Sequence, residues 1–328
     1  MNKELFLILA KRFFTSVIVL LMLLSLIFFL LRISPGDPMQ KYISPELSPQ
    51  LNEQVRTSFN LNKPVFEQYI AFIGNLLCGD FGISYEYKES VIKVILEFLP
   101  FTIIFASLSF LIQILLGSWT AIHTFKNKNG LIDKIISRTA LALYSIPTFV
   151  LAVILIFIFC VNFDLFPSAD LTSLDFNRYG FFNKLLDYAL HLVLPLITLS
   201  LGGIVIYYKY LRDNLDSISQ KPFVKYLAAN GTDKIVILKK HILPNAAGPM
   251  ISVAGIELGI LFGGALITEV IFSLPGMGRL TMLAIQVRDY PMVIGCTFIA
   301  GLLIIITNLI ADLIKVKIDK RLLRGVLE

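Results

Sequence analysis

Six long apolar runs alternate with polar and basic segments along this chain of 328 residues. Each run holds about the 20 residues that a helix needs to cross the hydrocarbon of a bilayer. The pattern therefore predicts an all-α integral membrane protein with six transmembrane helices. The predicted spans are Phe13 to Leu31, Leu99 to His123, Ala140 to Val161, Tyr188 to Tyr208, Pro249 to Thr268 and Pro291 to Ile314.

Two prolines interrupt the apolar pattern. Pro147 lies in the first turns of the third predicted span, and Pro195 lies inside the fourth. Because proline lacks the backbone donor and crowds the preceding turn, we expect a kink at Pro147, which neighbouring helices of a bundle tolerate. The first run is too long for the core of a signal peptide and no small-residue cleavage site follows it, so we expect it to be retained.

The segment from Arg32 to Glu97 is polar and mixed, and it begins with the turn-rich sequence SPGDP. Apolar residues recur at helical spacing from Phe66 to Leu77, which predicts an amphipathic helix resting on the membrane surface or on the bundle. We therefore expect two parts: an N-terminal transmembrane helix with an extracytoplasmic loop over residues 1–97, and a five-helix core over residues 98–328.

A second polar segment, Lys221 to Ala247, reads as two short helices broken at Gly231. Pro222 suits a first helical position, and Gly231 suits the left-handed residue that ends a helix. Thr232 is expected to cap the second helix. A compact basic hairpin of this kind would dock another protein, but a loop lying on the bilayer fits the same physics. The apolar residues predicted to share one face of the second helix are Ile235, Leu238 and Ile242.

The composition is 56% hydrophobic and only 16% charged, against about 25% charged in soluble proteins. If the N-terminus faces the cytoplasm, nineteen Lys and Arg residues fall in inner segments and four in the two short outer loops. The positive-inside rule therefore predicts cytoplasmic N- and C-termini and a cytoplasmic hairpin. The net charge of +6 is then a topology signal, and nucleic-acid binding is not needed to explain it. Cys78, Cys160 and Cys296 lack any metal-site spacing, so we interpret them as packing residues.

Glu257 is the one ionisable residue that the pattern places deep in a span. A charge at the centre of a membrane helix costs about 2.5 to 3.5 kcal/mol, so such residues are functional candidates. Two interpretations stay open: a site for a cationic group of a transported solute, or a protonated or hydrogen-bonded structural glutamate. Neighbouring glycines allow close helix packing or leave room along a pathway; they are Gly255, Gly259, Gly263 and Gly264.

Asn308 and Asp312 share a face near the inner end of the last span, which favours a tie between helices. The sequence has no GxxxxGK[ST], HExxH or GxSxG motif, so we expect no hydrolysis of nucleotides, and no metal-dependent or serine hydrolase, from this chain. It also has no series of intramembrane carboxylates, which disfavours an ion-driven pump.

The hairpin is similar to the signature of permease subunits of ATP-driven, binding-protein-dependent importers: a short Ala-rich helix, a Gly, nine residues and a hydrophobic-Pro ending. Further matches run in order through essentially the whole chain and resemble the branch that handles dipeptides, oligopeptides and nickel. The signature residues are Ala228, Ala229, Gly231, His241, Leu243, Pro244, Asn245 and Ala246. The other matching residues are Pro35, Gly36, Asp37, Pro38, Leu61, Lys63, Pro64, Gln68, Tyr69, Gly79, Asp80, Phe81, Gly82, Ser84, Ser145, Ile146, Pro147, Glu269, Phe272, Pro275, Gly276, Gly278, Arg279, Leu280, Arg288, Asp289, Tyr290, Pro291, Asn308, Asp312, Asp319 and Arg321.

The chain departs from that branch at a few positions. Ala228 and Asn230 stand where basic residues are usual, and Pro222 stands where an acidic residue is usual. Lys320 replaces a proline, and Glu257 replaces an uncharged polar residue. Charge pairing is therefore expected to contribute less to docking here than in the branch at large.

The resemblance implies a type I ABC importer transmembrane domain in the bacterial inner membrane. The hairpin of residues 221–246 would be the element that couples to an ATPase, through Ala228, Ala229, Gly231, His241, Leu243, Pro244 and Asn245. The implied partners are a second, similar permease, two ATPase subunits that carry ATP and Mg, an extracytoplasmic solute-binding protein and membrane lipid. No cofactor is expected on this chain.

The expected function is a permease subunit that translocates short peptides, with nickel, glutathione-like compounds or other small solutes as alternatives. Two further classes are weighed against it. A stand-alone secondary transporter or channel would move solute without ATP. An intramembrane enzyme would depend on Glu257 and release an altered product.

Overall fold

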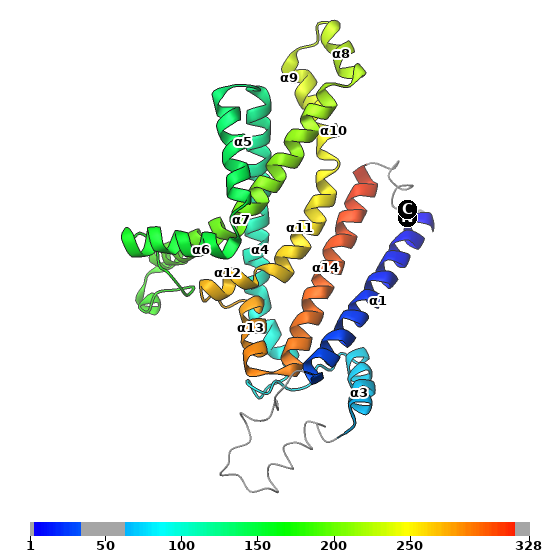
Figure 1. The fold of residues 1–328 in the computed structure, drawn as a ribbon, viewed down its shortest axis with the longest axis vertical. Helices are drawn as coiled ribbons and strands as arrows, with labels where there is room; N and C mark the ends of the chain where they lie inside the picture. The colour runs from blue at the N-terminus through cyan, green and yellow to red at the C-terminus, as the bar shows by residue number, and fades with distance from the viewer. Residues whose placement is uncertain (1–2, 34–62, 319–328) are drawn as a thin grey trace.

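The computed structural model describes residues 3–33 and 63–318, and most of them lie in helices (Figure 1). Among these residues, β pairing is limited to one isolated bridge between Ile83 and Ser90. The helices are α1 (Lys3–Ile33), α3 (Val65–Leu77), α4 (Val91–Lys126), α5 (Leu131–Tyr144), α6 (Thr148–Ile156), η1 (Phe157–Asn162), η2 (Phe176–Arg178), α7 (Phe181–Ser219), α8 (Pro222–Ala229), α9 (Lys234–Val236), η3 (Ile237–Ile242), α10 (Leu243–Ala247), α11 (Met250–Gly264), α12 (Leu266–Ile271), α13 (Met277–Val287) and α14 (Tyr290–Ile318).

The described part of the chain has five stretches long and apolar enough to cross a membrane, and a bent helix pair makes a sixth candidate. Helices α1, α4, α7 and α14 contain the first, second, fourth and sixth predicted spans, and the fifth runs through α11 and α12. Pro195 stays inside α7. The predicted all-helical membrane fold is thus confirmed, while one span differs in shape.

The third predicted span is two helices rather than one. Helix α5 and the continuous α6–η1 pair differ in direction by 102°. Pro147 precedes α6 with an extended backbone (ψ 139°), and the residue before a proline is disfavoured in a helix. The sequence predicts a kink at Pro147, whereas the structure has a complete break there, and α5 already begins at Leu131.

The helices α8 and α9 lie at one end of the molecule (Figure 1). The start of α1, the end of α14 and the turn between α4 and α5 lie toward the same end, whereas α3 and α13 lie toward the opposite end. Because the start of α1 and the end of α14 lie toward the same end, the chain from α1 to α14 passes along the bundle an even number of times. That the hairpin end faces the cytoplasm stays a prediction from the charge pattern.

Glycines bring two helix pairs into close contact. A Cβ atom on Gly117 of α4 would lie 2.6 Å from the Tyr207 Cβ and 2.8 Å from the Ile204 carbonyl oxygen of α7. A Cβ on Gly255 of α11 would lie 2.2 Å from the Ala311 Cβ of α14. Helices in lipid associate through such close contacts because lipid tails compete for apolar surface. Close packing, the first of the two interpretations of this glycine run, is therefore confirmed for Gly255.

Helix α1 packs along α14, and α3 packs on α1. Arg12 of α1 forms an ion pair with Asp312 of α14, whose side chain is buried, so the predicted helix tie at Asp312 is confirmed. Phe72 of α3 stacks on Phe28 of α1 with ring centroids 5.1 Å apart. The amphipathic helix thus rests on the bundle, one of the two placements predicted for it.

Some sequence-based expectations lie outside the described residues: the Ser34 to Pro38 turn, Leu61, Asp319, Lys320 and Arg321. The packing interpretation of the cysteines holds fully only for Cys296, which is buried. Cys160 is half-buried, and Cys78 is exposed because it follows the end of α3.

We predict that Gly117→Ala destabilises the protein, because the added methyl group must push α4 and α7 apart. Overpacking of this kind costs about 1 to 3 kcal/mol. The apparent melting temperature in detergent should fall for Gly117→Ala. The matched control is Gly202→Ala on α7, where an added Cβ meets nothing within 4 Å. Equal melting temperatures for the two variants would contradict the close crossing.

Candidate functional site

The hairpin follows directly from α7, with only Gln220 and Lys221 between the two helices. Pro222 occupies the first position of α8, as predicted. Gly231 has a φ of +75°, which confirms the predicted left-handed end of this helix. The Thr232 N–H donates to the Leu227 carbonyl and the Gly231 N–H to the Ala228 carbonyl, at 3.1 Å each. These are the two hydrogen bonds of a Schellman motif, so the turn at Gly231 has a defined geometry.

The second arm of the hairpin begins one residue later than predicted. Asp233, not Thr232, caps it: the Asp233 carboxylate accepts from the N–H groups of Ile235 at 2.8 Å and Val236 at 3.2 Å. Aspartate is among the strongest N-cap residues, and its charge also favours a helix N-terminus. The Thr232 prediction is therefore wrong because the neighbouring aspartate competes for the same donors.

The arm then widens into the π-helical segment η3 before α10. Pro244 has no N–H and would crowd the carbonyl four residues earlier, and a wide turn relieves such crowding. The wider turn also changes which side chains share a face. Ile237, Leu238 and Ile242 are buried, whereas Ile235 is 57% exposed. The predicted face is right for Leu238 and Ile242 and wrong for Ile235.

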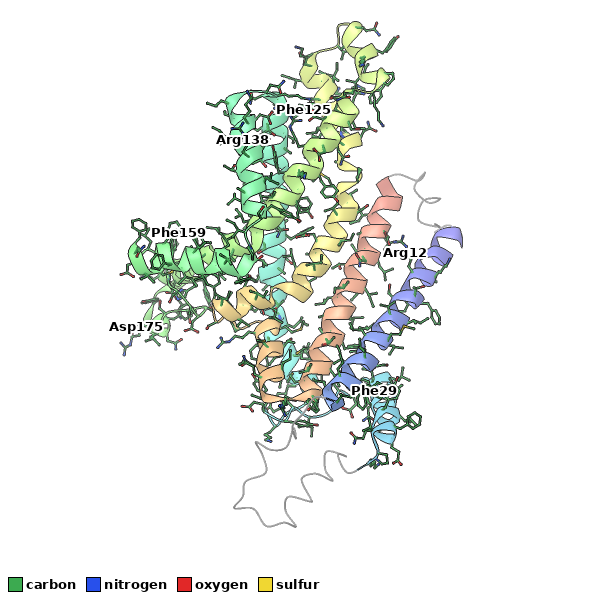
Figure 2. All side chains as sticks on the ribbon, viewed as in Figure 1. Arg12, Phe29, Phe125, Arg138, Phe159 and Asp175 are labelled. Atoms are coloured by element: carbon green, nitrogen blue, oxygen red, sulfur yellow. The ribbon has the colours of Figure 1, made fainter. Side chains whose placement is uncertain are left out.

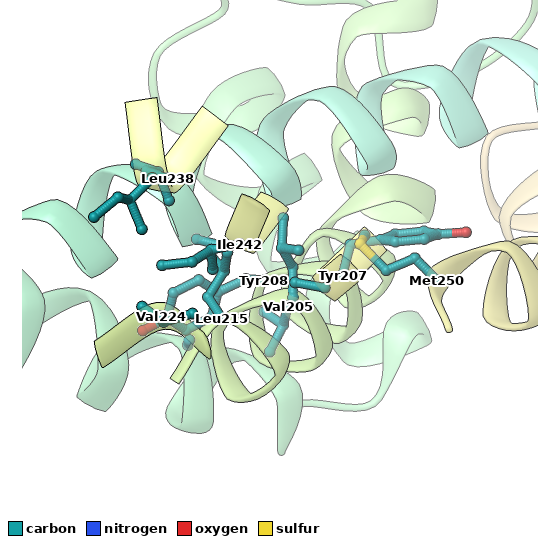
Figure 3. Close-up of a cluster of buried hydrophobic side chains, with 13 residues drawn as sticks. Val205, Tyr207, Tyr208, Leu215, Val224, Leu238, Ile242 and Met250 are labelled. Atoms are coloured by element: carbon teal, nitrogen blue, oxygen red, sulfur yellow. The ribbon is translucent and has the colours of Figure 1, made fainter. Parts of the chain in front are cut away.

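An apolar cluster attaches the hairpin to the bundle (Figure 3). Leu215 near the end of α7 belongs to the same buried cluster as Val224 of α8 and Ile242 of η3. Helices α8, α10 and η3 all contact α7. Burying a Val, Leu or Ile side chain contributes about 1.5 to 3 kcal/mol relative to leaving it in water. The base of the hairpin is therefore firmly packed on α7.

The predicted coupling residues divide into two groups. Ala228, Ala229 and Gly231 are exposed at the outer end of the hairpin, where Figure 1 places α8 and α9. The second group lies nearer the bundle, around α10. Pro244 and Asn245 are exposed, and the Asn245 side chain donates to the His241 carbonyl at 2.7 Å. The half-buried members of the second group are His241 and Leu243.

The outer surface of the hairpin combines apolar and basic side chains. Tyr226 is 68% exposed and Phe223 is 40% exposed. The one acidic residue of the hairpin, Asp233, is engaged in the helix cap. Such a surface offers apolar contact area inside a cationic rim. The exposed lysines are Lys221, Lys225, Lys234, Lys239 and Lys240.

Glu257 lies in α11 and is half-buried. Within the residues that the structure describes, no hydrogen bond or ion pair joins its carboxylate to another side chain. Its neighbours Gly255 and Gly259 face α14, where Ala311 and Thr307 lie closest to them. Glu257 therefore forms no polar bond across the close contact between α11 and α14.

Glu269 is the intramembrane carboxylate that sequence reasoning about span depth missed. It is fully buried, accepts from the Thr102 hydroxyl at 2.8 Å, and accepts from the N–H groups of Gly278 at 2.7 Å and Arg279 at 3.1 Å. The carboxylate thus caps the N-terminus of α13, where a negative charge is favoured. A Cβ on Gly276 would lie 2.1 Å from the Glu269 carboxyl carbon, so glycine is required for this approach.

Asp289 performs the same task one helix later. It is buried, it accepts from the Met292 N–H at 3.2 Å near the start of α14, and it accepts from the Glu86 N–H at 3.1 Å. The Ser84 hydroxyl also donates to it at 2.5 Å. The loop before α4 is therefore held against the start of α14. Only Asp289 had a local signal in the sequence, because it stands directly before the start of α14, whereas Glu269 lies inside α12 and reaches the start of α13 through the intervening turn.

These features define a class: a multi-pass, all-helical membrane protein with a compact, basic hairpin at one end. Comparison with known proteins gives the family. Residues 113–324 match the family described as the inner membrane component of binding-protein-dependent transport systems, and residues 5–106 match the N-terminal region of such membrane components. The chain belongs to this family.

Full-length relatives agree. The chain is 30% identical to the oligopeptide transport system permease protein AppB of Bacillus subtilis, over 95% of this chain and 98% of the relative. A Brucella suis protein named as a peptide permease is 32% identical over 92% of this chain and 94% of that protein. The nickel import system permease protein NikB of Staphylococcus aureus is 29% identical over 94% of this chain and 90% of that protein.

The fold is similar to a chain of the MetNI methionine ABC transporter solved in inward-facing conformations. The TM-score is 0.51 at 16% identity, with 72% of this chain and 97% of that chain covered. The protein is therefore a permease subunit of a binding-protein-dependent ABC importer and a transport component rather than an enzyme. ATP hydrolysis lies on separate subunits, and the importer implies ATPase and solute-binding partners. A stand-alone transporter and an intramembrane enzyme do not fit this family.

We predict that Glu269→Ala lowers stability much more than Glu257→Ala. The first variant leaves the N–H groups of the half-buried Gly278 and Arg279 and the buried Thr102 hydroxyl without their acceptor. A buried group left unsatisfied costs about 1 to 3 kcal/mol. The second removes a carboxylate with no such bonds. Apparent melting temperatures in detergent measure both effects, and an equal loss for the two variants would contradict the capping role of Glu269.

Proposed function

We propose that this permease subunit imports short peptides. The observation that supports the peptide assignment is the similarity over more than nine-tenths of the chain to proteins named as oligopeptide and peptide permeases. Nickel is the alternative, because a nickel import permease is similar over nearly the same length. Glutathione-like compounds and other small solutes would use the same route.

The hairpin of residues 221–246 is the ATPase-coupling element in this proposal. A coupling element must be contacted by the ATPase and must move as a unit with the membrane helices. The exposed apolar and basic surface around Tyr226 supports the first requirement, and the packed base on α7 supports the second. Because Ala228 and Asn230 are neutral, docking here relies more on apolar contact than on ion pairs. The proposed coupling residues are Ala228, Ala229, Gly231, His241, Leu243, Pro244 and Asn245.

The proposed assembly contains a second, similar permease, two ATPase subunits with ATP and Mg, and a solute-binding protein on the outer side. The similarity of the fold to a chain of the MetNI transporter supports the second permease. The end that carries the Glu269-capped turn and the Ser84–Asp289 contact would face the solute-binding protein.

Glu257 is the proposed polar contact along the solute pathway. Its half-buried carboxylate forms no hydrogen bond or ion pair among the described residues, although the Tyr207 hydroxyl lies within reach of its charge, and it would attract a cationic group such as a peptide ammonium. A protonated or hydrogen-bonded structural glutamate is the alternative, and the buried Tyr207 hydroxyl, which has no hydrogen-bond partner among the described residues, is a candidate partner for it.

We predict that Gly231→Val abolishes uptake while the complex still assembles. A β-branched residue at a φ of +75° is strained, so the turn between α8 and the second arm must change shape. Uptake in proteoliposomes holding the full complex should fall at least about tenfold, a loss equal to about 1.4 kcal/mol. Gly231→Asn, which tolerates left-handed geometry, should retain most uptake. Full uptake by the valine variant would contradict the coupling role.

The peptide assignment is tested by the ligand that co-purifies with the solute-binding protein. Mass spectrometry of that ligand should reveal peptides of a few residues, and a purified nickel complex would overturn the assignment. Uptake of the identified ligand should then fall in Glu257→Gln, because the charge that attracts its ammonium is gone. Unchanged uptake in this variant would remove Glu257 from the pathway.

A further inference from the structure

The hairpin end of α7 presents two different faces. Leu211 and Leu215 belong to the apolar cluster that also contains Val224 and Ile242 of the hairpin. Arg212 is the next residue after Leu211, and its polar contacts are directed to α4 and α5 instead. Helix α7 is thus attached to the hairpin by apolar contacts, and to α4 and α5 both by the same apolar cluster, which includes Ala121 and Ala140, and by the buried charge of Arg212.

Arg212 is only 8% exposed and touches three helices. Its guanidinium lies 3.6 Å from the Asp133 carboxylate of α5, and it forms an ion pair with Asp216 of α7 itself. It also lies over the Phe125 ring of α4, 5.4 Å from the ring centroid. Figure 2 labels Phe125 near the end of α4 that faces the hairpin. A cation over an aromatic ring is favourable, and more so when water is excluded.

The turn between α4 and α5 joins the same network. Lys128 pairs with Asp216 at 2.7 Å, and the Asn129 N–H donates to Asp133 at 3.0 Å. Two cations, Lys128 and Arg212, therefore face two carboxylates, and the network is neutral. Within this network Arg212 is buried, Asp133 and Asp216 are half-buried and Lys128 is exposed. Removing Arg212 is therefore costly, because the two half-buried carboxylates lose its compensating charge.

The two kinds of contact hold α5 and α7 together in different ways. Apolar contacts hold packed helices through the fit of their side chains and contain no directional bond. The Arg212 guanidinium adds an ion pair with Asp133 of α5 at 3.6 Å, and its contacts with Asp216 and the Phe125 ring orient it toward that carboxylate. Arg212 therefore adds a charged connection between α5 and α7 to the apolar contacts beside it.

We propose that Arg212 is a positioning residue of the transport cycle: it makes α5 move with α7 when the ATPase displaces the hairpin. The proposal rests on the coupling function proposed for the hairpin. Helix α5 continues through the 102° break into α6, and α6 packs against α12, the helix that carries Glu269. A displacement of α5 would therefore move α6 and η1, which together are about 22 Å long. Through them the displacement would reach α12, toward the opposite half of the bundle.

Uptake per ATP hydrolysed in proteoliposomes with the complete complex tests this role. Arg212→Gln should assemble and hydrolyse ATP but lose at least about tenfold in solute imported per ATP. Arg212→Lys, which keeps the charge, should retain part of the coupling. The double variant Arg212→Asp with Asp133→Arg should import more solute per ATP than either single variant. The matched control is Arg138→Gln, an exposed arginine of α5, which should behave as wild type (Figure 2).

A cross-link distinguishes positioning from mere stability. Ser137 of α5 and Tyr208 of α7 meet through their hydroxyl groups at 2.8 Å. Cysteines at these two positions, in a background without the three native cysteines, can be joined by a short thiol cross-linker. The cross-link should leave wild-type uptake intact and should restore the coupling of Arg212→Gln, since it replaces the lost connection.

Three outcomes would overturn the proposal: normal coupling in Arg212→Gln, loss of uptake when α5 is cross-linked to α7, or failure of both Arg212→Gln and Arg212→Lys to assemble. The Gly231→Val variant separates this failure from failure of the proposed function. If Gly231→Val loses uptake while Arg212→Gln keeps its coupling, the hairpin still couples and Arg212 alone is dispensable.

Discussion

The structure depends on one constraint: polar groups placed among apolar helices must find partners within the protein, because hydrocarbon offers none. Glu269 meets the N–H groups that begin α13, and Asp289 meets those that begin α14. Arg12 meets Asp312, and Arg212 meets Asp133 and Asp216. Each of these contacts adds a directional bond between elements that also pack through apolar side chains. The polar pairs therefore fix where the long helices stand relative to one another.

The hairpin is held by a different balance of forces because it lies beyond the spans. Its outer turn is shaped locally, by the Schellman bonds at Gly231 and the Asp233 cap. Its base is shaped by long-range packing on α7, where Leu215, Val224 and Ile242 are buried together. A local turn that keeps its shape on a packed base moves as one body. This is the property that a docking element needs if a force on its tip is to reach the membrane helices.

Much of this architecture could be predicted from the sequence. Span length located five of the six crossings, and helix-end chemistry located Pro222 and Gly231, because these signals are local. The misses have physical reasons. The break at Pro147 depends on how α5 and α6 pack against α7, and the π turn before Pro244 shifts the buried face away from Ile235. Glu269 and Arg212 were missed as structural centres because their partners, Thr102 and Asp133, lie far away in the sequence.

The central claim is that the hairpin and α7 form one rigid body that carries motion from the ATPase. Spin labels at Asn230 on the hairpin and Asp213 on α7, both exposed, measure this directly in the assembled transporter. The distance distribution should be the same in the nucleotide-free and ATP-bound states while uptake is active. A second distance that appears with ATP would show that the hairpin swings on α7, and it would contradict the account.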